Sequence, residues 1–234
     1  MISIVTVNYN NYEGLVRTCE SVWSQSGANY EHIIIDGGST DGSIGFIEKY
    51  RSRFSHVSVG KDNGIFDAMN LGLEYAEGDW VNFLNSGDTY ENHFVLDHLI
   101  KFSLLNVSAG VIYGNTLVDG GVVKPKALVN LRYGGLAGIG HQSIFYNRAK
   151  CGSELFYSTK YKYLGDVELT RRLYKFGLEF RYMDYTVAHY EGGGFSSVSN
   201  WNSKKASMYY MTQHYGVLGF IFLILGKLKN RLNS

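Results

Sequence analysis

The apolar residues of the first 85 positions fall into short runs, separated by stretches in which they recur at every third or fourth position. Runs of this length bounded by turn residues are typical of buried strands, and the recurrence is typical of amphipathic helices. Strands and helices that alternate along a chain predict a mostly parallel sheet with right-handed crossovers. We expect strands at 2–8, 30–36, 57–59 and 80–84, and helices at 12–25, 44–50 and 65–76.

The pattern of the following residues is less regular. Residues 94–147 mix a helix with strand-like pieces, 166–176 return to helical spacing, and 180–183 predict a last short strand. We therefore interpret 1–90 as the nucleotide-binding half of an α/β domain of Rossmann type, and 91–200 as the half that meets an acceptor. No G-x-G-x-x-G sequence follows the first strand, which weighs against a dinucleotide site.

The last residues, 201–234, differ from the rest of the chain in charge. A helix is predicted over 201–215, and the continuous apolar run 217–225 is shorter than the ~20 residues that span a bilayer. The last acid is Glu191, so 201–234 carries a formal charge of +5 and the rest of the chain −4. Because basic residues are attracted to anionic lipid, this helical tail is a candidate for membrane contact, and packing on the domain or on a partner subunit is the alternative.

Composition excludes several classes of protein. With 234 residues, 45% of them hydrophobic and only one proline, the chain is expected to fold as one packed α/β domain. Cys19 and Cys151 are too far apart in sequence for a metal knot or a disulfide framework. The chain begins directly with a strand pattern and shows no secretory signal or nucleic-acid motif. We therefore expect a cytoplasmic protein without a nucleic-acid partner, peripheral on the inner face of the cell membrane if the tail binds lipid.

Three loops rich in carboxylates and glycine follow the predicted strands, at 36–42, 61–64 and 85–88. Loops at the carboxyl ends of parallel strands meet at one edge of the sheet and form a ligand crevice there. Acids gathered on one rim repel each other unless a cation lies between them, or hydroxyl groups and a base edge donate to them. The chemistry of these loops therefore suits a sugar nucleotide held with a divalent metal.

Motif-like segments continue along the chain: VTVNYN at 5–10, IDGGSTDG at 35–42, DNGIFDAMN at 62–70, NSGD at 85–88, HQS at 141–143, Asp166, and GGGFS at 192–196. In their residues and their order, these segments resemble the family 2 glycosyltransferases. That family has the GT-A fold, a Rossmann-like, mostly parallel central sheet flanked by helices, which would cover residues 1–200. The resemblance implies an inverting transfer, in which an acceptor hydroxyl attacks the anomeric carbon of a nucleotide sugar opposite the departing diphosphate.

The resemblance gives Asp88 and Asp166 the central roles. Asp88 would bind Mg²⁺ or Mn²⁺, a cation that bridges the diphosphate oxygens and stabilises the leaving charge. The family often has Asp-x-Asp here, whereas this chain reads Ser86-Gly87-Asp88, so the first acid is absent. Asp166 stands where the family keeps its catalytic base and would accept the proton of the acceptor hydroxyl, with a helix N-cap as its structural alternative. Glu168 is a rival base, but its offset of two residues points it to another side of the helix.

The other candidate residues are expected around the sugar nucleotide. Each also has a structural explanation, because Asp and Asn favour turns and helix caps, and a histidine is often a hydrogen-bonded structural residue. By resemblance, the nucleoside would contact Thr6, Asn8, Tyr9, Asp36 and Asp62, and the donor sugar would contact Asp67, Asn70 and Ser86. His189 is a second candidate metal ligand, His141 is a candidate contact of the acceptor or the diphosphate, and Asp41 is expected to cap a helix.

These expectations combine into one hypothesis. The chain would be a hexosyl- or N-acetylhexosaminyltransferase that moves a sugar from a UDP-sugar to a lipid-linked (polyprenyl diphosphate) or glycan acceptor, in the biosynthesis of a bacterial surface polysaccharide such as O-antigen or capsule. A sugar nucleotidyltransferase is the weaker alternative, because no Gly-rich basic loop for a triphosphate stands near the N-terminus. An inactive carbohydrate-binding or scaffold subunit is a further alternative, which the missing acid of the metal motif permits.

Overall fold

The first four strands of the protein are parallel, as their alternation with helices predicts. The computed structural model describes residues 1–119, 121–125, 140–161, 163–192 and 209–210. The strands are β1 (Ile2–Asn8), β2 (Tyr30–Asp36), β3 (His56–Val59) and β4 (Trp80–Phe83), and the helices between them are α1 (Tyr12–Trp23), α2 (Ser43–Lys49) and α3 (Ile65–Glu74). β1 pairs with β2 on one side and β4 on the other, and β3 lies beyond β2. Each predicted element of this half is present, with ends that differ by a residue or two.

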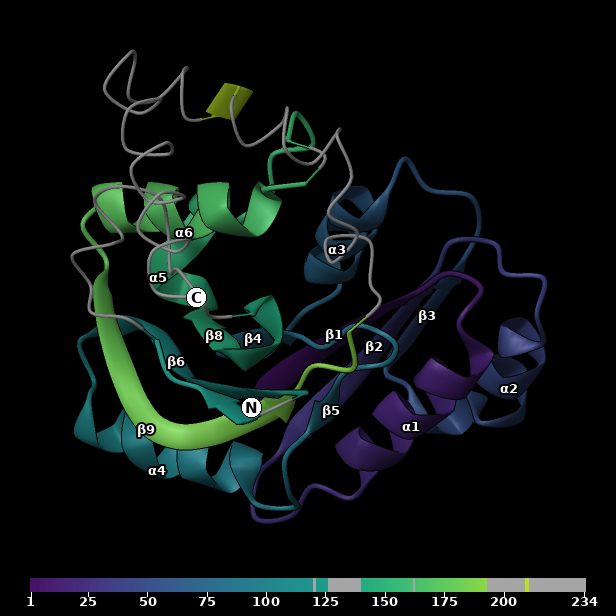
Figure 1. The fold of residues 1–234 in the computed structure, drawn as a ribbon, viewed down its shortest axis with the longest axis horizontal. Coiled ribbons are helices and arrows are strands. Elements are labelled where there is room, and N and C mark those ends of the chain that lie inside the picture. The colour runs from purple at the N-terminus through teal and green to yellow at the C-terminus, as the bar shows by residue number, and fades with distance from the viewer. Residues whose placement is uncertain (120, 126–139, 162, 193–208, 211–234) are drawn as a thin grey trace, which may run out of the picture.

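The second half extends the same sheet with strands of both directions (Figure 1). Its elements are β5 (Thr89–Tyr90), α4 (Val95–Leu105), β6 (Ala109–Val118), β7 (Gly121–Val123), β8 (Ile144–Asn147), α5 (Arg148–Cys151), α6 (Gly165–Lys175) and β9 (Glu179–His189), with short 3₁₀ helices η1 (Arg51–Arg53), η3 (His141–Ser143) and η4 (Gly152–Leu155). β8 is antiparallel to both β4 and β6, and β9 is parallel to β6. The short strands β5 and β7 are antiparallel to β9 and β6. The predicted α/β fold with a central sheet is thus confirmed, and the sheet is parallel in its first half and mixed in its second.

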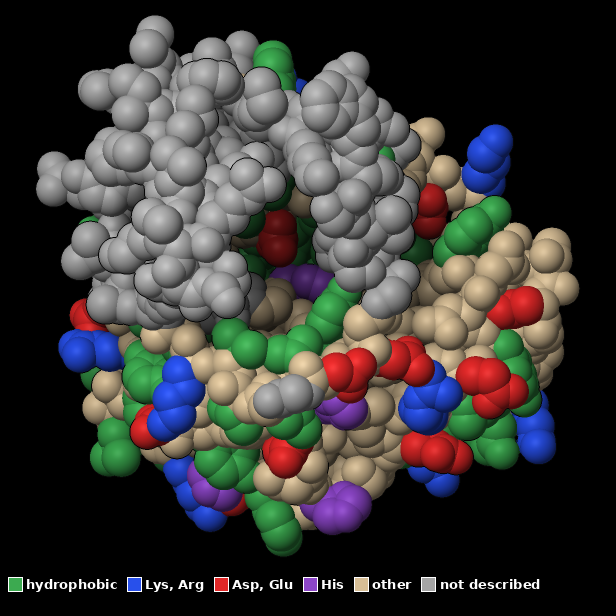
Figure 2. Space-filling model, viewed as in Figure 1, with side chains coloured by type: hydrophobic (Ala, Val, Ile, Leu, Met, Phe, Trp, Pro, Cys, Tyr) green, Lys and Arg blue, Asp and Glu red, His purple; other side chains and the backbone are tan. Residues whose placement is uncertain are grey.

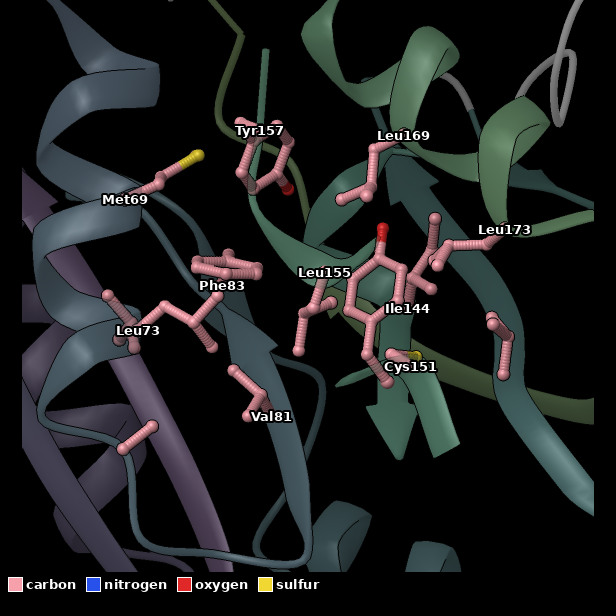
Figure 3. Packing of buried hydrophobic residues seen from close by; sticks show 14 of the residues in the cluster. Met69, Leu73, Val81, Phe83, Ile144, Cys151, Leu155, Tyr157, Leu169 and Leu173 are labelled. Atoms are coloured by element: carbon pink, nitrogen blue, oxygen red, sulfur yellow. The ribbon is translucent and has the colours of Figure 1, made fainter. Parts of the chain in front are cut away.

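Helices cover both faces of the sheet, and among the described residues one face has one apolar cluster and the other has two. In Figure 1, α3, α5 and α6 lie on one side of the sheet, and α1, α2 and α4 on the other. Successive side chains of a strand point to opposite faces, so Val5 and Val7 of β1 pack with the cluster under α3 and α6, whereas Ile2 and Ile4 pack towards α1 and α4. Figure 3 shows part of the first cluster, in which Met69 and Leu73 of α3 lie beside Phe83, and Leu169 and Leu173 of α6 lie on the side of Ile144.

The last strand is longer than the pattern predicts. A strand was expected at 180–183, but β9 spans Glu179–His189, and its pairing with β6 shifts register around Asn115. The polar residue that interrupts the apolar pattern is Asp184, whose carboxylate accepts hydrogen bonds from Tyr182, Asn115 and Lys124. Asp184 is exposed, and the backbone beyond it pairs with β6, so the strand continues through it, curling as Figure 1 shows.

The predicted tail, 201–234, lies outside the described residues except for Tyr209 and Tyr210. Tyr210 is buried, with its ring 5.4 Å from that of Tyr161 and its face 6.0 Å from the Arg171 guanidinium. This point of the tail therefore packs on the α6 side of the domain. Within the described ranges, none of the helices has the length and apolar character needed to cross a bilayer.

Gly72 allows α3 to lie directly on the sheet. A Cβ atom at Gly72 would overlap with the Val5 side chain of β1 and lie 3.4 Å from Ile35 of β2. Gly45, in the middle of α2, is exposed and has nothing within 4 Å of the same point. Two glycines in helices on opposite faces of the sheet thus stand in opposite environments.

We expect Gly72→Ala to lower the free energy of unfolding by roughly 1–3 kcal/mol, because the added methyl group overpacks the contact between α3 and β1. Gly45→Ala is the matched control and should raise the free energy of unfolding by about 0.5–1 kcal/mol, since alanine restricts the unfolded chain and favours the helix. Urea denaturation of both variants measures the two changes. Equal effects of the same sign would show that the close approach of α3 does not depend on Gly72.

Candidate functional site

The carboxyl end of β1 holds together the loops that form the candidate site. The backbone N–H of Gly37 donates to the carbonyl of Asn8 (2.9 Å), and that of Ser86 donates to the carbonyl of Val7 (3.1 Å). The loops that follow β2 and β4 therefore lie on either side of this strand end, where ligands bind in open parallel sheets. Figure 2 shows a hollow in the surface between α3 and α6, with an acidic and a histidine side chain at its bottom.

Asp36 stabilises the loop after β2 through hydrogen bonds made in the protein interior. Its side chain is fully buried, and its carboxylate accepts hydrogen bonds from the backbone N–H groups of Gly38 (3.0 Å) and Ser39 (2.7 Å), from Asn8 Nδ2 (2.7 Å) and from the Ser39 hydroxyl (2.8 Å). Two donors thus meet each carboxylate oxygen, which fills the usual capacity of the group. In this structure Asp36 shapes the loop and presents no free oxygen to a ligand.

Thr6 and Asn8 are buried as well. The Thr6 hydroxyl lies 3.0 Å from Nε2 of His32, whose pKa burial lowers to about 3, so the ring is neutral. Asn8 uses its amide N–H groups on Asp36 and on Ser39. Three of the five predicted nucleoside contacts therefore build the strand ends from within.

Tyr9 and Asp62 face the open side of the same loop. Tyr9 is 67% exposed, and a Cβ atom at Gly37 would lie 3.1 Å from its ring and 2.9 Å from Asp62 Oδ2. The other oxygen of Asp62 accepts a hydrogen bond from the backbone N–H of Gly64 (2.9 Å). Gly37 therefore lets an aromatic ring and a carboxylate oxygen approach the same stretch of backbone, a combination that suits stacking and hydrogen bonding of a nucleoside.

The predicted donor-sugar contacts are engaged with the protein itself. Asp67 Oδ2 accepts hydrogen bonds from the backbone and the side chain of Asn63 (3.0 and 3.2 Å). Asn70 donates to the carbonyl of Tyr157 (2.9 Å) and accepts from the N–H of the same residue (2.7 Å). The buried Ser86 hydroxyl has no hydrogen-bond partner within the described ranges. Of the three residues, only Ser86 has a buried polar atom without a hydrogen-bond partner among the described residues.

Asp88 is an acid held away from water. Burial raises the pKa of Asp88 to about 7. A hydrogen bond with the backbone of Glu191 lowers this pKa, and the negative charge of Glu191 raises it. Helix α1 fixes the backbone of the loop, since the Thr18 hydroxyl donates to the carbonyl of Asp88 (2.7 Å) and accepts from the N–H of Gly87 (3.0 Å). No described Lys or Arg forms an ion pair with Asp88, so its charge has no compensating cation from these parts of the chain.

His141 lies between Asp88 and Asp166. Its Nε2 is 4.0 Å from Asp88 Oδ2 and 2.7 Å from Asn85 Nδ2. Burial lowers the pKa of His141, and the charge of Asp166 acts in the opposite direction. The acid predicted to bind metal and the acid predicted to be the base therefore both influence one partly buried histidine.

Asp166 and Glu168 differ in what their carboxylates contact. The N-cap of α6 is Leu164, so the N-cap alternative for Asp166 is wrong. Asp166 Oδ1 accepts a hydrogen bond from the N–H of Val167 (2.9 Å), which leaves Oδ2 without one from any described residue. Both oxygens of Glu168 accept from the Arg172 guanidinium (2.9 and 3.2 Å). Glu168 is thus engaged in an ion pair, and Asp166 is the acid with a free oxygen.

Glu191 is a residue of the site that the sequence analysis missed. His189 is the last residue of β9 and pairs with Thr89, the residue after Asp88. The backbone hydrogen bond and the charge that affect the pKa of Asp88, however, come from Glu191. The Glu191 carboxylate forms an ion pair with Arg17 of α1 and lies so close to Gly87 that a Cβ atom there would overlap with it. The feature of the sequence that could have pointed to Glu191 is Gly87. This residue has a positive φ of 105°, and because it has no side chain, the Glu191 carboxylate can lie against it.

The donor set fits a divalent cation that arrives with a diphosphate. Among the described residues, no group of three His, Cys, Asp or Glu side chains could hold a metal by itself. Asp88 nevertheless provides a buried, hard oxygen ligand without a paired cation. Mg²⁺ commonly takes one or two protein carboxylates and completes its coordination with phosphate oxygens and water. Asp88 meets that requirement.

The comparisons with known proteins agree on one family. The family model described as Glycosyl transferase family 2 matches residues 3–179. The PGL/p-HBAD biosynthesis glycosyltransferase of Mycobacterium bovis (strain BCG / Pasteur 1173P2) is 28% identical over 211 residues, which are 84% of this chain and 79% of the relative. The protein named "Putative teichuronic acid biosynthesis glycosyltransferase TuaG" of Bacillus subtilis (strain 168) is 29% identical over 138 residues, which are 55% of this chain and 54% of the relative.

Solved structures share the fold. S. aureus TarS 1-349 in complex with UDP-GlcNAc superposes with a TM-score of 0.70 at 18% identity, over 89% of this chain and 64% of that chain. The mannosyltransferase PcManGT from Pyrobaculum calidifontis, in complex with GDP-Man and Mn²⁺, superposes with a TM-score of 0.66 at 15% identity, over 84% of this chain and 58% of that chain. The chain thus spans less than two thirds of the length of these two solved chains. The GT-A fold is confirmed.

We expect Asp36→Asn to lower the free energy of unfolding by roughly 2–4 kcal/mol, because the amide NH₂ that replaces one oxygen would face two hydrogen-bond donors inside the protein. Asp62→Asn is the matched control, since its oxygen can still accept from Gly64, and should change the free energy of unfolding by less than about 0.5 kcal/mol. Urea denaturation at neutral pH compares the two. A stable Asp36→Asn variant would contradict the interior role of Asp36.

The raised pKa of Asp88 predicts a stability that depends on pH. The carboxyl keeps its proton up to about pH 7 in the folded protein and loses it near pH 3.8 in the unfolded chain, so the folded state binds more protons between these values. Its contribution to stability is therefore lost as the pH rises from about 4 to about 7. We expect the stability of Asp88→Asn relative to the natural protein to increase by up to roughly 4 kcal/mol over this range.

Urea denaturation at pH 4 and pH 8, with EDTA present, measures this difference for Asp88. The same substitution at Asp97, a partly buried acid paired with Lys101 on α4, serves as the control. A difference between Asp88→Asn and the natural protein that is constant with pH would show that Asp88 titrates as an ordinary exposed acid.

Proposed function

The chain belongs to glycosyl transferase family 2 and has the GT-A fold, and on this basis we propose that it transfers a hexose or an N-acetylhexosamine from a UDP-sugar to an acceptor hydroxyl, with inversion. The observation that carries the proposal is that the partly buried His141 lies 4.0 Å from Asp88 and is also affected by the charge of Asp166. An inverting displacement needs one acidic group near the leaving diphosphate and another near the attacking hydroxyl.

The nucleoside is proposed to bind between Tyr9 and Asp62, above Gly37. The exposed Tyr9 ring offers a face for stacking, and Asp62 Oδ2 accepts from the base or the ribose. Thr6, Asn8 and Asp36 support this place from beneath through the hydrogen bonds that shape the loop. The UDP-GlcNAc bound in the TarS structure supports a UDP-sugar as the donor. The GDP-Man bound in the mannosyltransferase structure makes a GDP-sugar the main alternative donor.

Asp88 is proposed to hold a divalent cation, Mn²⁺ or Mg²⁺, through its buried carboxylate. The cation would neutralise the charge that develops on the diphosphate as the bond to the anomeric carbon breaks. The Mn²⁺ in the mannosyltransferase structure supports this assignment. In the free protein the raised pKa of Asp88 means that a cation and a proton compete for the same oxygen. His141, beside Asp88, is proposed to face the diphosphate, whereas His189 remains a weaker candidate ligand.

Asp166 is proposed as the general base. Val167 holds one of its oxygens, and the other is free to accept the proton of the acceptor hydroxyl as the new bond to the anomeric carbon forms. Glu168 is excluded from this role by its ion pair with Arg172. The proton of the acceptor thus ends on Asp166, and the electron pair of the broken bond leaves with the diphosphate.

The acceptor is proposed to be a growing surface polysaccharide or a lipid-linked glycan. The Bacillus relative is named for teichuronic acid biosynthesis, which supports a polysaccharide as the acceptor. The charge of +5 on residues 201–234 supports a peripheral position on an anionic membrane surface, where a polyprenyl diphosphate acceptor would reside. Burial of Tyr210 shows that at least one residue of the tail packs on the domain.

Calorimetric titration with UDP, GDP and dTDP, with and without Mn²⁺, tests the donor site. We expect UDP to bind most tightly and Mn²⁺ to tighten it. Asp88→Asn should remove the increase in UDP affinity that Mn²⁺ gives. Asp62→Asn should weaken UDP binding by about 1–2 kcal/mol both with and without Mn²⁺, because the variant loses a charged hydrogen-bond acceptor. Asp166→Asn should bind UDP normally and turn over a UDP-sugar at least ~100-fold more slowly, as expected for a lost general base.

Several outcomes would contradict the proposal. Failure of all three nucleotides to bind would favour the scaffold alternative, and release of pyrophosphate from UTP and a sugar phosphate would favour a nucleotidyltransferase. NMR of the first-formed product reports the anomeric configuration, and retention of the donor configuration would rule out the single inverting displacement. Normal turnover of Asp166→Asn would remove the base assignment alone.

A further inference from the structure

One side-chain hydrogen bond of the candidate site joins Asn85, two residues after β4, to His141, the first residue of η3. The Asn85 amide nitrogen Nδ2 lies 2.7 Å from Nε2 of the His141 ring. An amide NH₂ group is a donor only, so Nε2 accepts this bond through its lone pair. A neutral ring that accepts at Nε2 carries its proton on Nδ1. Burial, which lowers the pKa of His141, also favours the neutral ring.

The same ring nitrogen faces the acid that is proposed to hold the cation. Nε2 of His141 lies 4.0 Å from Asp88 Oδ2, which is longer than the roughly 2.7–3.2 Å of an N–H···O hydrogen bond. With a proton on Nε2, a shift of about 1 Å would turn this contact into a hydrogen bond to a charged acceptor. The bond from Asn85 therefore prevents His141 from donating to Asp88.

Buried contacts hold both partners of this bond in place. The backbone carbonyl of Asn85 accepts a hydrogen bond from the Thr18 hydroxyl of α1 (3.3 Å). On the other side, Asn82 of β4 is fully buried, and its Nδ2 donates to the carbonyls of Gln142 (3.1 Å) and Ile144 (2.8 Å). Because β4 fixes η3 in this way, the end of the same strand can present Asn85 to the ring at a defined distance.

The stability of the fold does not account for the Asn85 side chain. Its Oδ1 atom is buried without a hydrogen-bond partner among the described residues, and so is the hydroxyl of the next residue, Ser86. Buried polar atoms without partners destabilise a folded protein. Both oxygens belong to the loop that ends at Asp88, where the water molecules around a bound cation would supply donors. The loop is therefore better suited to a cation than to the protein alone.

We propose that Asn85 is a positioning residue whose amide occupies Nε2 of His141 and thereby leaves the Asp88 carboxylate free for the divalent cation. Without this bond, the ring proton could move to Nε2, and His141 would compete with the cation for Asp88. The proton on Nδ1 stays available as a donor, which suits the proposed contact of His141 with the diphosphate. This inference rests on the roles proposed above for Asp88 and His141.

NMR of the full-length protein at pH 8, without substrate or metal, tests the hydrogen bond directly. In protein labelled with ¹⁵N-histidine, the ring signals of His141 are identified by their absence from the spectrum of His141→Phe. We expect a protonated Nδ1 and an unprotonated Nε2. Asn85→Asp keeps the shape but offers only acceptors, so it should place a proton on Nε2, and Asn85→Leu should change the proton position by removing the bond. Asn106→Leu, which removes an amide bonded to the Phe102 carbonyl beyond α4, is the matched control.

Binding of Mn²⁺ to the complex with UDP, followed by electron paramagnetic resonance, tests the consequence for Asp88. We expect Asn85→Leu to weaken Mn²⁺ binding about 10-fold, as for competition by a hydrogen bond to a charged group. UDP binding without Mn²⁺ should change by less than about twofold, because Tyr9 and Asp62 are untouched. In the His141→Phe background, Asn85→Leu should leave the Mn²⁺ affinity unchanged, since the competing donor is absent.

The outcomes separate this inference from the proposed function. A proton on Nε2 in the natural protein, or one on Nδ1 that neither Asn85 variant moves, overturns the inference whatever the activity. An equal loss of Mn²⁺ affinity with and without His141 also overturns it, because Asn85 would then act without the ring. Normal Mn²⁺ binding by Asn85→Leu, with a loss in Asp88→Asn, overturns the inference and keeps the metal assignment. No effect of Mn²⁺ on UDP binding by the natural protein overturns the metal assignment and, with it, this role of Asn85.

Discussion

The site depends on how β1 ends. The carbonyls of Val7 and Asn8, the last residues of this central strand, accept hydrogen bonds from the loops that follow β2 and β4, so neither loop can move without breaking a sheet-like contact. Asn8 adds a side-chain bond to the buried Asp36, which in turn holds two backbone N–H groups of its own loop. Because these groups are buried, leaving one unpaired would be costly, and the loops have a single arrangement. Tyr9 and Asp62 owe their positions to this closure.

The second constraint is electrostatic. Asp88 is buried, Glu191 adds negative charge beside it, and Asp166 lies on the other side of a histidine whose pKa burial lowers. Arg17 compensates the charge of Glu191 through an ion pair, but no described basic side chain does the same for Asp88. An uncompensated carboxylate in a region of low dielectric destabilises the free protein and attracts a cation more strongly than an exposed one. The same burial therefore lowers stability and prepares the site for a charged ligand.

The apolar core connects the two sides of the site. Phe66 and Asn70 of α3 hold Tyr157, and Gly165 lets the start of α6 approach Phe66, so the helix beside the donor loop and the helix that carries Asp166 pack as one body. The leucines on the inner face of α6 anchor that helix in the cluster beneath it. The role proposed for Asp166, a general base within hydrogen-bond distance of a hydroxyl, needs such a rigid support. Substitutions that loosen this core should be read as changes of geometry as well as of stability.

The hydrophobic pattern of the chain predicted the parallel half of the sheet and its helices almost to the residue, because short apolar runs and helical periodicity are local properties. It did not predict the full length of β9, since Asp184 looks like an interruption until Tyr182, Asn115 and Lys124 are seen to satisfy it. Local patterns also could not show which carboxylates are free. Asp36 and Asp88 both stand in glycine-rich loops at strand ends. The carboxylate of Asp36 accepts four hydrogen bonds from its surroundings, whereas that of Asp88 does not.

The sequence by itself thus determined the fold class, the edge of the sheet at which the acids gather, and the choice of Asp88 and Asp166 as the acids of interest. Tertiary structure alone decided which predicted residues serve the interior, that Glu168 is held by Arg172, and that Glu191 lies beside Asp88. The physical reason is that availability of a polar group depends on its burial and on its partners. Those partners lie far apart in sequence and meet only when the chain has folded.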